Sequence, residues 1–255
     1  MFTLKSINMS TCIVSAFYEI PSKASIEFYL PHVDRFFNYI TQECVFFTNN
    51  STYTKLEPII VKYNKKNIHV TLLEFEELPG LAYRDYNFWK DQCKIDVEKY
   101  HTPELAIIWH NKSHLVKKAT TITDHKYYIW CDSGCIRNEQ WKDICSNFGH
   151  RNRITDNTIS VQLLRGLPYN KVYFSYPDVY VAGAIMGGER NMWEVFIQEY
   201  EKTIDKYVSN SVCCNMDQYI IASSILSNPT IFTPVLYNYA EYSCPDSWFF
   251  FLCYL

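Results

Sequence analysis

The chain has 255 residues, of which 48% are hydrophobic and 20% are charged, and its formal net charge is −3. No run of Lys or Arg exceeds two residues, so the chain lacks the basic stripe of a dedicated nucleic-acid-binding protein. Its seven glycines form neither a GxGxxG nor a GxxxxGKS/T motif, which argues against dinucleotide-binding and P-loop proteins. The length suits a single domain over residues 1–255 with a substantial core.

The first part of the chain alternates between strand and helix patterns. Residues 11–17 (TCIVSAF) and 44–48 (CVFFT) are apolar and rich in β-forming residues, which predicts two strands. Between them, residues 25–41 carry aromatic and aliphatic side chains at helical spacing. Residues 58–63 and 68–75 are further β-like segments. This order predicts a parallel sheet.

The second part continues the alternation. Thr102, Pro103 and Glu104 predict a helix start, because they supply a cap, a proline at the first helical position and an acid in the first turn. This helix is expected to run to about Ala119. Further elements are expected at 127–131 (strand), 179–186 (strand ended by Gly187 and Gly188), 193–208 (helix) and 215–226 (helix capped by Asn215), with an irregular segment at 229–255.

The ten cysteines include no CxxC pair, and several lie inside apolar runs, as buried reduced thiols do. This usage favours a reducing compartment and argues against structural zinc. No basic segment followed by an apolar one opens the chain, and the longest apolar tract, 248–255, is too short to cross a bilayer. The sequence therefore predicts a cytoplasmic protein without a transmembrane segment.

The most informative stretch is 126–134, KYYIWCDSG. Its apolar run predicts a strand covered on both faces, which stops at Asp132, Ser133 and Gly134. A carboxylate at the carboxyl end of a buried strand is where open α/β folds place ligand chemistry. There Asp132 can hold a divalent metal, and Gly134 lets the backbone approach a ligand. The alternative is a plain turn in which Asp132 caps its own loop.

Two other polar pairs could take part in chemistry. Lys112, next to Asn111 on the helix before the Asp132 strand, could steady phosphate oxygens, although a lysine here is more often on a solvated helix face. Asp217 and Gln218 fall in the first turn of a predicted helix, where the helix dipole alone favours an acid. Their functional alternative is a contact with a hydroxyl or a sugar.

Gly187 and Gly188 belong to a glycine-rich tract, 182–188 (AGAIMGG). Small residues there permit close packing and a tight exit turn. They would equally let a sugar or a phosphate lie against the backbone. The sequence leaves both alternatives open.

The order of these pieces resembles the HtrL/YibB-type family, which includes the WlaTC-like sugar transferases. The resemblance spans nearly the whole chain. It rests on 13–18 (IVSAFY), 108–112 (IWHNK), 128–135 (YIWCDSGC), Arg137, 181–188 (VAGAIMGG), Trp193, Asp217-Gln218 and 248–250 (WFF).

The resemblance implies a GT-A-like fold, a nucleotide-sugar-binding α/β/α sandwich with a central, mostly parallel sheet. It implies a glycosyltransferase of the hexosyl type that moves a sugar from a nucleotide-diphosphate donor, expected to be a UDP sugar, to a hydroxyl of a glycan or another acceptor. In such folds an Asp-x-Asp signature binds Mn²⁺ or Mg²⁺ with the donor diphosphate. Asp132 is similar to the first Asp of that signature, and Gly134 stands where the second would be.

The resemblance also implies roles for individual residues. The donor nucleotide would contact Ser15, Ala16, Tyr18, Asn111, Lys112, Asp132, Ser133 and Gly134, with Asp132 as the metal ligand. Gly187 and Gly188 would border the donor sugar or the acceptor. Asp217, Gln218 and Lys112 would be catalytic, with Asp217 taking the acceptor proton if the reaction inverts configuration and positioning the donor if it retains it.

Two other functions remain as alternatives. A catalytically weak nucleotide- or glycan-binding protein would keep the same fold without the second metal carboxylate. A nucleotidyltransferase on a related fold is disfavoured, because the sequence has no Gly-rich, basic phosphate loop near its first strand.

Overall fold

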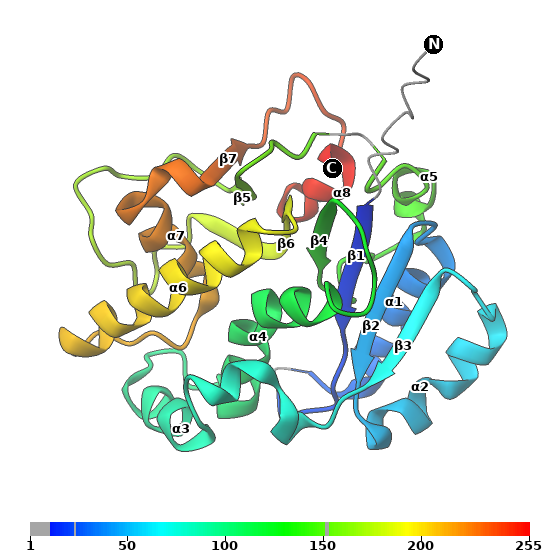
Figure 1. The fold of residues 1–255 in the computed structure, drawn as a ribbon, viewed down its shortest axis with the longest axis horizontal. Helices are drawn as coiled ribbons and strands as arrows, with labels where there is room; N and C mark the ends of the chain where they lie inside the picture. The colour runs from blue at the N-terminus through cyan, green and yellow to red at the C-terminus, as the bar shows by residue number, and fades with distance from the viewer. Residues whose placement is uncertain (1–10, 23, 151–152) are drawn as a thin grey trace, which may run out of the picture.

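The structure is a computed structural model, and it describes residues 11–22, 24–150 and 153–255 (Figure 1). Within these ranges, seven strands form one sheet in the order β3-β2-β1-β4-β6-β5-β7. The strands are β1 (Thr11–Ala16), β2 (Glu43–Thr48), β3 (Ile68–Leu72), β4 (Tyr127–Cys131), β5 (Ile159–Leu163), β6 (Val181–Glu189) and β7 (Phe232–Leu236).

Helices cover both faces of this sheet (Figure 1). One face packs against α4 (Pro103–Ala119), α6 (Met192–Ser209) and α7 (Asp217–Ser227), with α3 (Tyr86–Ile95) outside α4. The other face carries α1 (Ile26–Tyr39), α2 (Asn50–Tyr63) and the short helices α5 (Lys142–Cys145) and α8 (Phe251–Tyr254). No helix in the described part of the chain has both the length and the apolar character needed to cross a bilayer.

The direction of the strands determines which loops meet. The strands β3, β2, β1 and β4 run parallel to one another, β6 is antiparallel to its neighbours β4 and β5, and β7 is parallel to β5. The expected α/β/α sandwich with a mostly parallel sheet is therefore confirmed. The carboxyl ends of β1 and β4 lie at one edge of the sheet, and β6 begins at that same edge.

The central strands are buried on both faces, which explains their unbroken apolar sequences. In β1, Val14 packs against the α4 side and Ile13 against the α1 side. In β4, Trp130 packs on the α4 side of the sheet and Cys131 on the α1 side. This alternation follows from the period of two residues in a strand.

Most of the expected elements lie where the sequence places them, but residues 58–63 do not form a strand. They are the second half of α2, which begins at Asn50 because the side chain of Asn49 accepts a hydrogen bond from the backbone N–H of Thr52 (3.0 Å). Only Thr52 and Leu56 of this helix are buried. With so few buried positions, α2 has a weak helical pattern, and its apolar end resembles a strand.

The glycine pair does not end the strand either. β6 continues through Gly187 and Gly188 to Glu189, because this stretch pairs with β4 on one side and β5 on the other. Asn215 does not cap α7: its side-chain amide donates to Oδ2 of Asp96 (2.7 Å), and the helix starts after Met216. The strands β5 and β7 and the helices α3, α5 and α8 had no expected counterpart, and β7 and α8 lie within 229–255, which was expected to be irregular.

Candidate active site at the carboxyl ends of β1 and β4

The connections of β1 mark the place where an open α/β sheet binds its ligands. From β1 the chain passes to β2 and β3 on one side, and it then crosses to β4 on the other side of β1. Ligands bind outside the carboxyl ends of the strands that flank such a reversal. A cleft of about 480 Å³ lies there, lined by the end of β1 and the residues after it (16–20), by 132–134 after β4, by one face of α4 and by residues 248–249.

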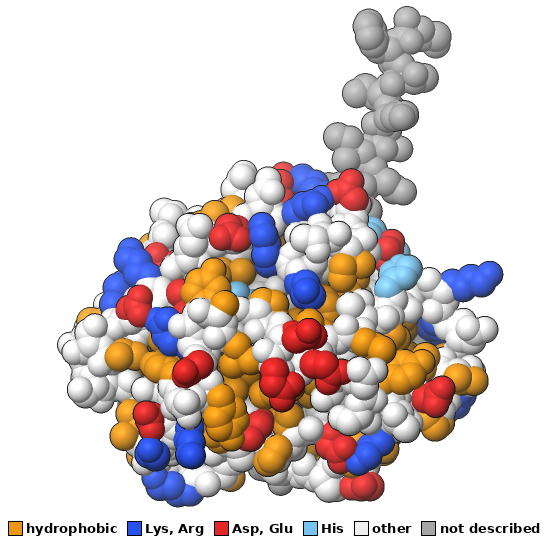
Figure 2. Space-filling view, turned by 60° about the horizontal axis from the view of Figure 1, so that its bottom comes forward, with side chains coloured by type: hydrophobic (Ala, Val, Ile, Leu, Met, Phe, Trp, Pro, Cys, Tyr) orange, Lys and Arg blue, Asp and Glu red, His pale blue; other side chains and the backbone are white. Residues whose placement is uncertain are grey.

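Figure 2 turns the lower side of Figure 1, toward which these parallel strands point, to the viewer. Hydrophobic side chains are spread over this face, and acidic side chains gather near its centre. The side of the molecule to which the strand ends belong therefore offers both apolar contact area and charge.

Lys112 lies at the floor of the cleft, where its ammonium group contacts two carboxylates. Its side chain is only 5% exposed, and Nζ lies 2.9 Å from Oδ2 of Asp217 and 3.3 Å from Oδ1 of Asp132. Nζ also donates to the carbonyl oxygen of Gly183 (2.8 Å). Groups from α7, the end of β4 and the beginning of β6 thus converge on one ammonium.

Asp132 is held in place on both sides of its strand. Its backbone N–H donates to the carbonyl of Ala184 (2.9 Å), and the hydroxyl of the next residue, Ser133, donates to the carbonyl of Ala16 (3.0 Å). The indole N–H of Trp130 donates to Oδ1 of Asp132 (2.7 Å). The Asp132 side chain is 36% exposed, so it is the carboxylate of the cluster that a ligand in the cleft can contact.

Asp217 lies behind Lys112 in the protein interior. Its side chain is 5% exposed and does not line the cleft. A Cβ atom at Gly183 would come within 2.8 Å of Oδ2 of Asp217, so the absence of a side chain at that position leaves room for the carboxylate. In this arrangement Asp217 orients Lys112 and does not face the cleft, unlike the contact with a reacting sugar that the resemblance implies.

The two carboxylates determine the charge of Lys112. Burial alone lowers the pKa of a lysine, because the charged form loses its water. Here the attraction of Asp132 and Asp217 outweighs burial, and the pKa of Lys112 is raised above its ordinary value. Burial also raises the pKa of Asp217, although Lys112 acts in the opposite direction. Lys112 is therefore a permanent cation at neutral pH.

The structure brings most of the expected site residues into the cleft. The members of the set that line it are Ala16, Tyr18, Lys112, Asp132, Ser133, Gly134 and Gln218. Of these, Gln218 is held by a hydrogen bond from its amide to the carbonyl of Val181 (2.6 Å).

Ser15 and Asn111 lie outside the cleft. Ser15 is fully buried inside β1. The amide oxygen of Asn111 accepts from the backbone N–H of Gly80 (2.7 Å), and its amide nitrogen donates to the carbonyl of Ile107 (2.8 Å). Asn111 therefore fastens the segment around Gly80 to α4, and this placement does not match a contact with a donor nucleotide.

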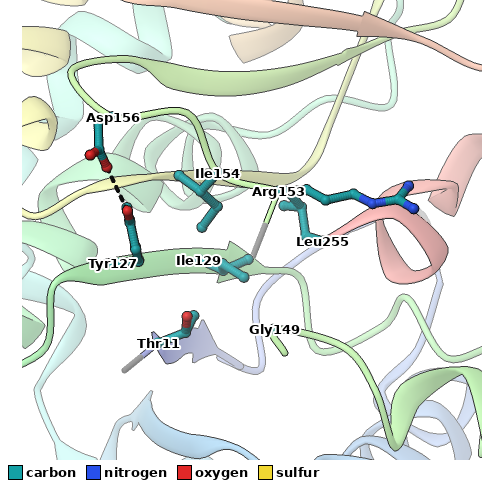
Figure 3. A pocket seen from close by; sticks show the side chains of 8 residues that line it. All are labelled: Thr11, Tyr127, Ile129, Gly149, Arg153, Ile154, Asp156 and Leu255. Carbon is teal, nitrogen blue, oxygen red and sulfur yellow. Dashed lines mark hydrogen bonds between the residues drawn. The ribbon is translucent and has the colours of Figure 1, made fainter. Parts of the chain in front are cut away.

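Gly187 and Gly188 lie at the opposite edge of the sheet, because β6 runs antiparallel to β4 and its carboxyl end points away from the cleft. A Cβ atom at Gly187 would meet Leu255 and Ile154 at 3.0 and 3.2 Å. Both of these residues line a second cavity of about 260 Å³ at that edge (Figure 3). The glycine of this tract that adjoins the cleft cluster is Gly183.

The second cavity offers less to a ligand. Its walls include Ile129, Ile154 and Leu255, and the carboxylate of Asp156, which also lines it, accepts a hydrogen bond from Tyr127 (Figure 3). The side chain of Arg153 extends toward α8 and away from the other residues in this view (Figure 3). The cleft is therefore the better candidate site.

Several residues that line the cleft had no expected role. Arg137 lies there with its guanidinium carbon 5.2 Å from the ring centre of Phe249, and Tyr29, Trp109 and Trp248 add further aromatic surface. All except Tyr29 lie in or next to segments that carry the family resemblance. The family resemblance could therefore have pointed to these residues. Tyr29 reaches the cleft only because of how α1 packs, which the sequence does not reveal.

The same contacts test whether the site fits Mn²⁺ or Mg²⁺. Such a cation needs free carboxylate lone pairs, completed by phosphate oxygens and water. Both oxygens of Asp132 lie 3.3–3.4 Å from the Lys112 ammonium, and Asp217 is turned to that same ammonium. Among the described residues, no three His, Cys, Asp or Glu side chains are placed to share a metal ion. These side chains do not fit a resident divalent cation.

Comparison with known proteins leaves the family open. No family model and no curated protein matches the sequence, so the resemblance to the HtrL/YibB-type family stays a prediction. Among solved structures, the chain is similar to "a glycosyltransferase involved in the glycosylation of the major capsid of PBCV-1". The TM-score is 0.45 and the identity 10%, over 90% of this chain and 81% of that one. A similarity of this size assigns neither a function nor a site.

Proposed function

We propose that the protein is a glycosyltransferase that moves a sugar from a nucleotide-diphosphate donor, with a UDP sugar as the first candidate, to a hydroxyl acceptor. The observation that carries the proposal is the convergence of Lys112, Asp132 and Asp217 at the floor of a cleft beyond the carboxyl ends of β1 and β4. Charged groups are costly to bury, and such clusters occur at functional sites more often than elsewhere.

The walls of the cleft suit a ligand with flat and polar parts. Its volume of about 480 Å³ falls within the range of small-molecule sites. Trp109, Tyr29 and Trp248 present aromatic faces on which a base or the apolar face of a sugar can stack. The charged end of the cleft, at Asp132, supplies contacts for the hydroxyl and phosphate groups of the same ligand.

The cluster has a plain role in such a reaction. Negative charge grows on the diphosphate as the bond to the sugar breaks, and a fixed cation nearby stabilises that charge without having to reorganise. Lys112 is fixed in this way by its three acceptors. Asp132 is the carboxylate within reach of a substrate hydroxyl, and Asp217 acts through Lys112 as a positioning residue.

The test is turnover of nucleotide sugars by the purified chain, followed as release of the free nucleotide diphosphate. We expect transfer or slow hydrolysis with one donor class, and a loss on the order of a hundredfold in Asp132→Asn, comparable to removal of one electrostatic contact to a transition state. Asp91→Asn is the matched control, because Asp91 is exposed on α3, away from the cleft, and its ion pair is with the neighbouring Lys94.

Two results would contradict the proposal. Nucleotide binding without turnover of any donor would favour the alternative of a weak nucleotide- or glycan-binding protein. Turnover that is unchanged in Asp132→Asn would place the reaction elsewhere on the molecule.

A further inference from the structure

The charged side chains that line the cleft are Glu19, Lys112, Asp132 and Arg137, and three of them are already neutralised. Glu19 pairs with Lys55, while Lys112 and Asp132 pair with each other. Within the described residues, no carboxylate lies at ion-pair distance from Arg137, and its guanidinium lies over the ring of Phe249. Arg137 is thus the cleft's unneutralised cation.

The surroundings of Arg137 suit the recognition of an anion. An aromatic ring beside a guanidinium holds its plane by a cation–π contact without using any of its N–H donors. The five donors of Arg137 therefore remain available, and a guanidinium matches two phosphate oxygens at once. Its position, three residues after Gly134, places it beside the strand end that carries Asp132.

The residues at the expected metal site also favour binding of the diphosphate by a side chain instead of by a metal ion. A divalent cation would have to share Asp132 with an ammonium that lies 3.3 Å from it, and the mutual repulsion of the two cations opposes this. The place of the second signature carboxylate is taken by Gly134, around whose Cβ position no atom lies within 4 Å. Apart from the buried Lys112, the cation that contacts the diphosphate must therefore come from a side chain that lines the cleft.

We propose that Arg137 binds the diphosphate of the nucleotide-sugar donor directly, and that donor binding requires no divalent metal ion. This inference rests on the proposed function, because it assumes that the cleft takes a nucleotide diphosphate. It assigns Asp132 to a hydroxyl group of the ligand instead of to a metal ion.

The test is calorimetric titration of the full chain with UDP, GDP and ADP, each in EDTA and in Mn²⁺. We expect one nucleotide to bind with the same affinity, within about twofold, under both conditions. Arg137→Gln should weaken that binding by about tenfold or more, as expected for loss of a charge-assisted contact. Arg165→Gln is the matched control, because Arg165 also lies over an aromatic ring, Tyr180, outside the cleft.

A second variant tests the metal directly. Gly134→Asp restores the Asp-x-Asp spacing at a position with open space, so we expect it to fold and to bind the nucleotide more tightly in Mn²⁺ than in EDTA. Such a gain would show that the assay detects a metal contribution where one exists.

The outcomes separate this inference from the proposed function. Wild-type binding that requires Mn²⁺, or binding unchanged in Arg137→Gln, would overturn the inference and leave the transferase proposal in place. No binding of any nucleotide diphosphate under either condition would overturn both.

Discussion

The pockets at the two edges of the sheet differ in size and in how their charged residues are arranged. At the edge where β1 and β4 end, a cleft of about 480 Å³ is built on an ammonium and two carboxylates. At the edge where these strands begin, a cavity of about 260 Å³ mixes the aliphatic side chains of Ile129, Ile154 and Leu255 with polar ones, and Gly187 packs against two of those aliphatic residues. Both edges contain motif residues quoted for the same family resemblance. The direction of each strand, which decides where its last residues lie, separates the two.

We expect the largest change in the free energy of unfolding from Lys112→Met, at the edge of the sheet that carries the cleft. Removing the ammonium leaves Asp217 as a buried charge without compensation, and a loss of this kind costs about 3–5 kcal/mol of unfolding free energy. Urea denaturation of the purified variant measures it. The double variant Lys112→Met/Asp217→Asn should recover much of the loss, because no uncompensated buried charge remains and Asp132 is partly exposed. Equal loss in the single and double variants would show that the packing of Lys112, and not its charge, is what matters.

The second prediction compares how a substitution at one glycine from each edge changes stability and nucleotide binding. Gly188→Val should lower the unfolding free energy by about 1–3 kcal/mol, because even a Cβ atom there meets Ile159 at 2.3 Å and the carbonyl of Thr158 at 3.2 Å. Gly134→Val should change it by less than about 0.5 kcal/mol, because its Cβ position is open, yet it should weaken nucleotide binding. Thermal unfolding and calorimetry of both variants provide the measurements. Nucleotide binding that is weakened in Gly188→Val and unchanged in Gly134→Val would place the ligand site at the opposite edge.

The smallest expected effect is the contribution of Asp217 to the pH dependence of stability. Because burial raises its pKa in the folded protein, the stability contributed by this group is present in full below the ordinary carboxyl pKa of about 4 and is lost as the pH rises through the folded value. Asp217→Asn cannot titrate, so its stability relative to the wild type should increase from acidic to neutral pH.

The size of that change should be about 1 kcal/mol or less, comparable to one internal hydrogen bond, because Lys112 keeps Asp132 as a partner. Urea denaturation of both proteins at a series of pH values from acidic to neutral measures it. A relative stability that stays constant, or that falls with rising pH, would contradict the raised pKa.

The sequence alone predicted the central strands and the long helices, because local chemistry specifies them. The apolar run before Asp132 has to be covered on both faces, and Thr102 caps α4 by accepting the N–H of Leu105 (3.2 Å), as the order Thr-Pro-Glu indicates. The same local rules failed for α2, which has few buried residues to set a helical period, and for Pro234 in β7, which sits on an edge strand where a proline is tolerated.

For the site, the sequence determined that Asp132 ends a buried strand and that Lys112 lies on the preceding helix. Only the tertiary structure decided that both meet Asp217 on one ammonium, that Asn111 serves the packing of α4, and that Gly187 and Gly188 face away from the cleft. The physical reason is that sequence patterns report the face and the end of an element, whereas strand direction and the distance between charges depend on how distant elements pack.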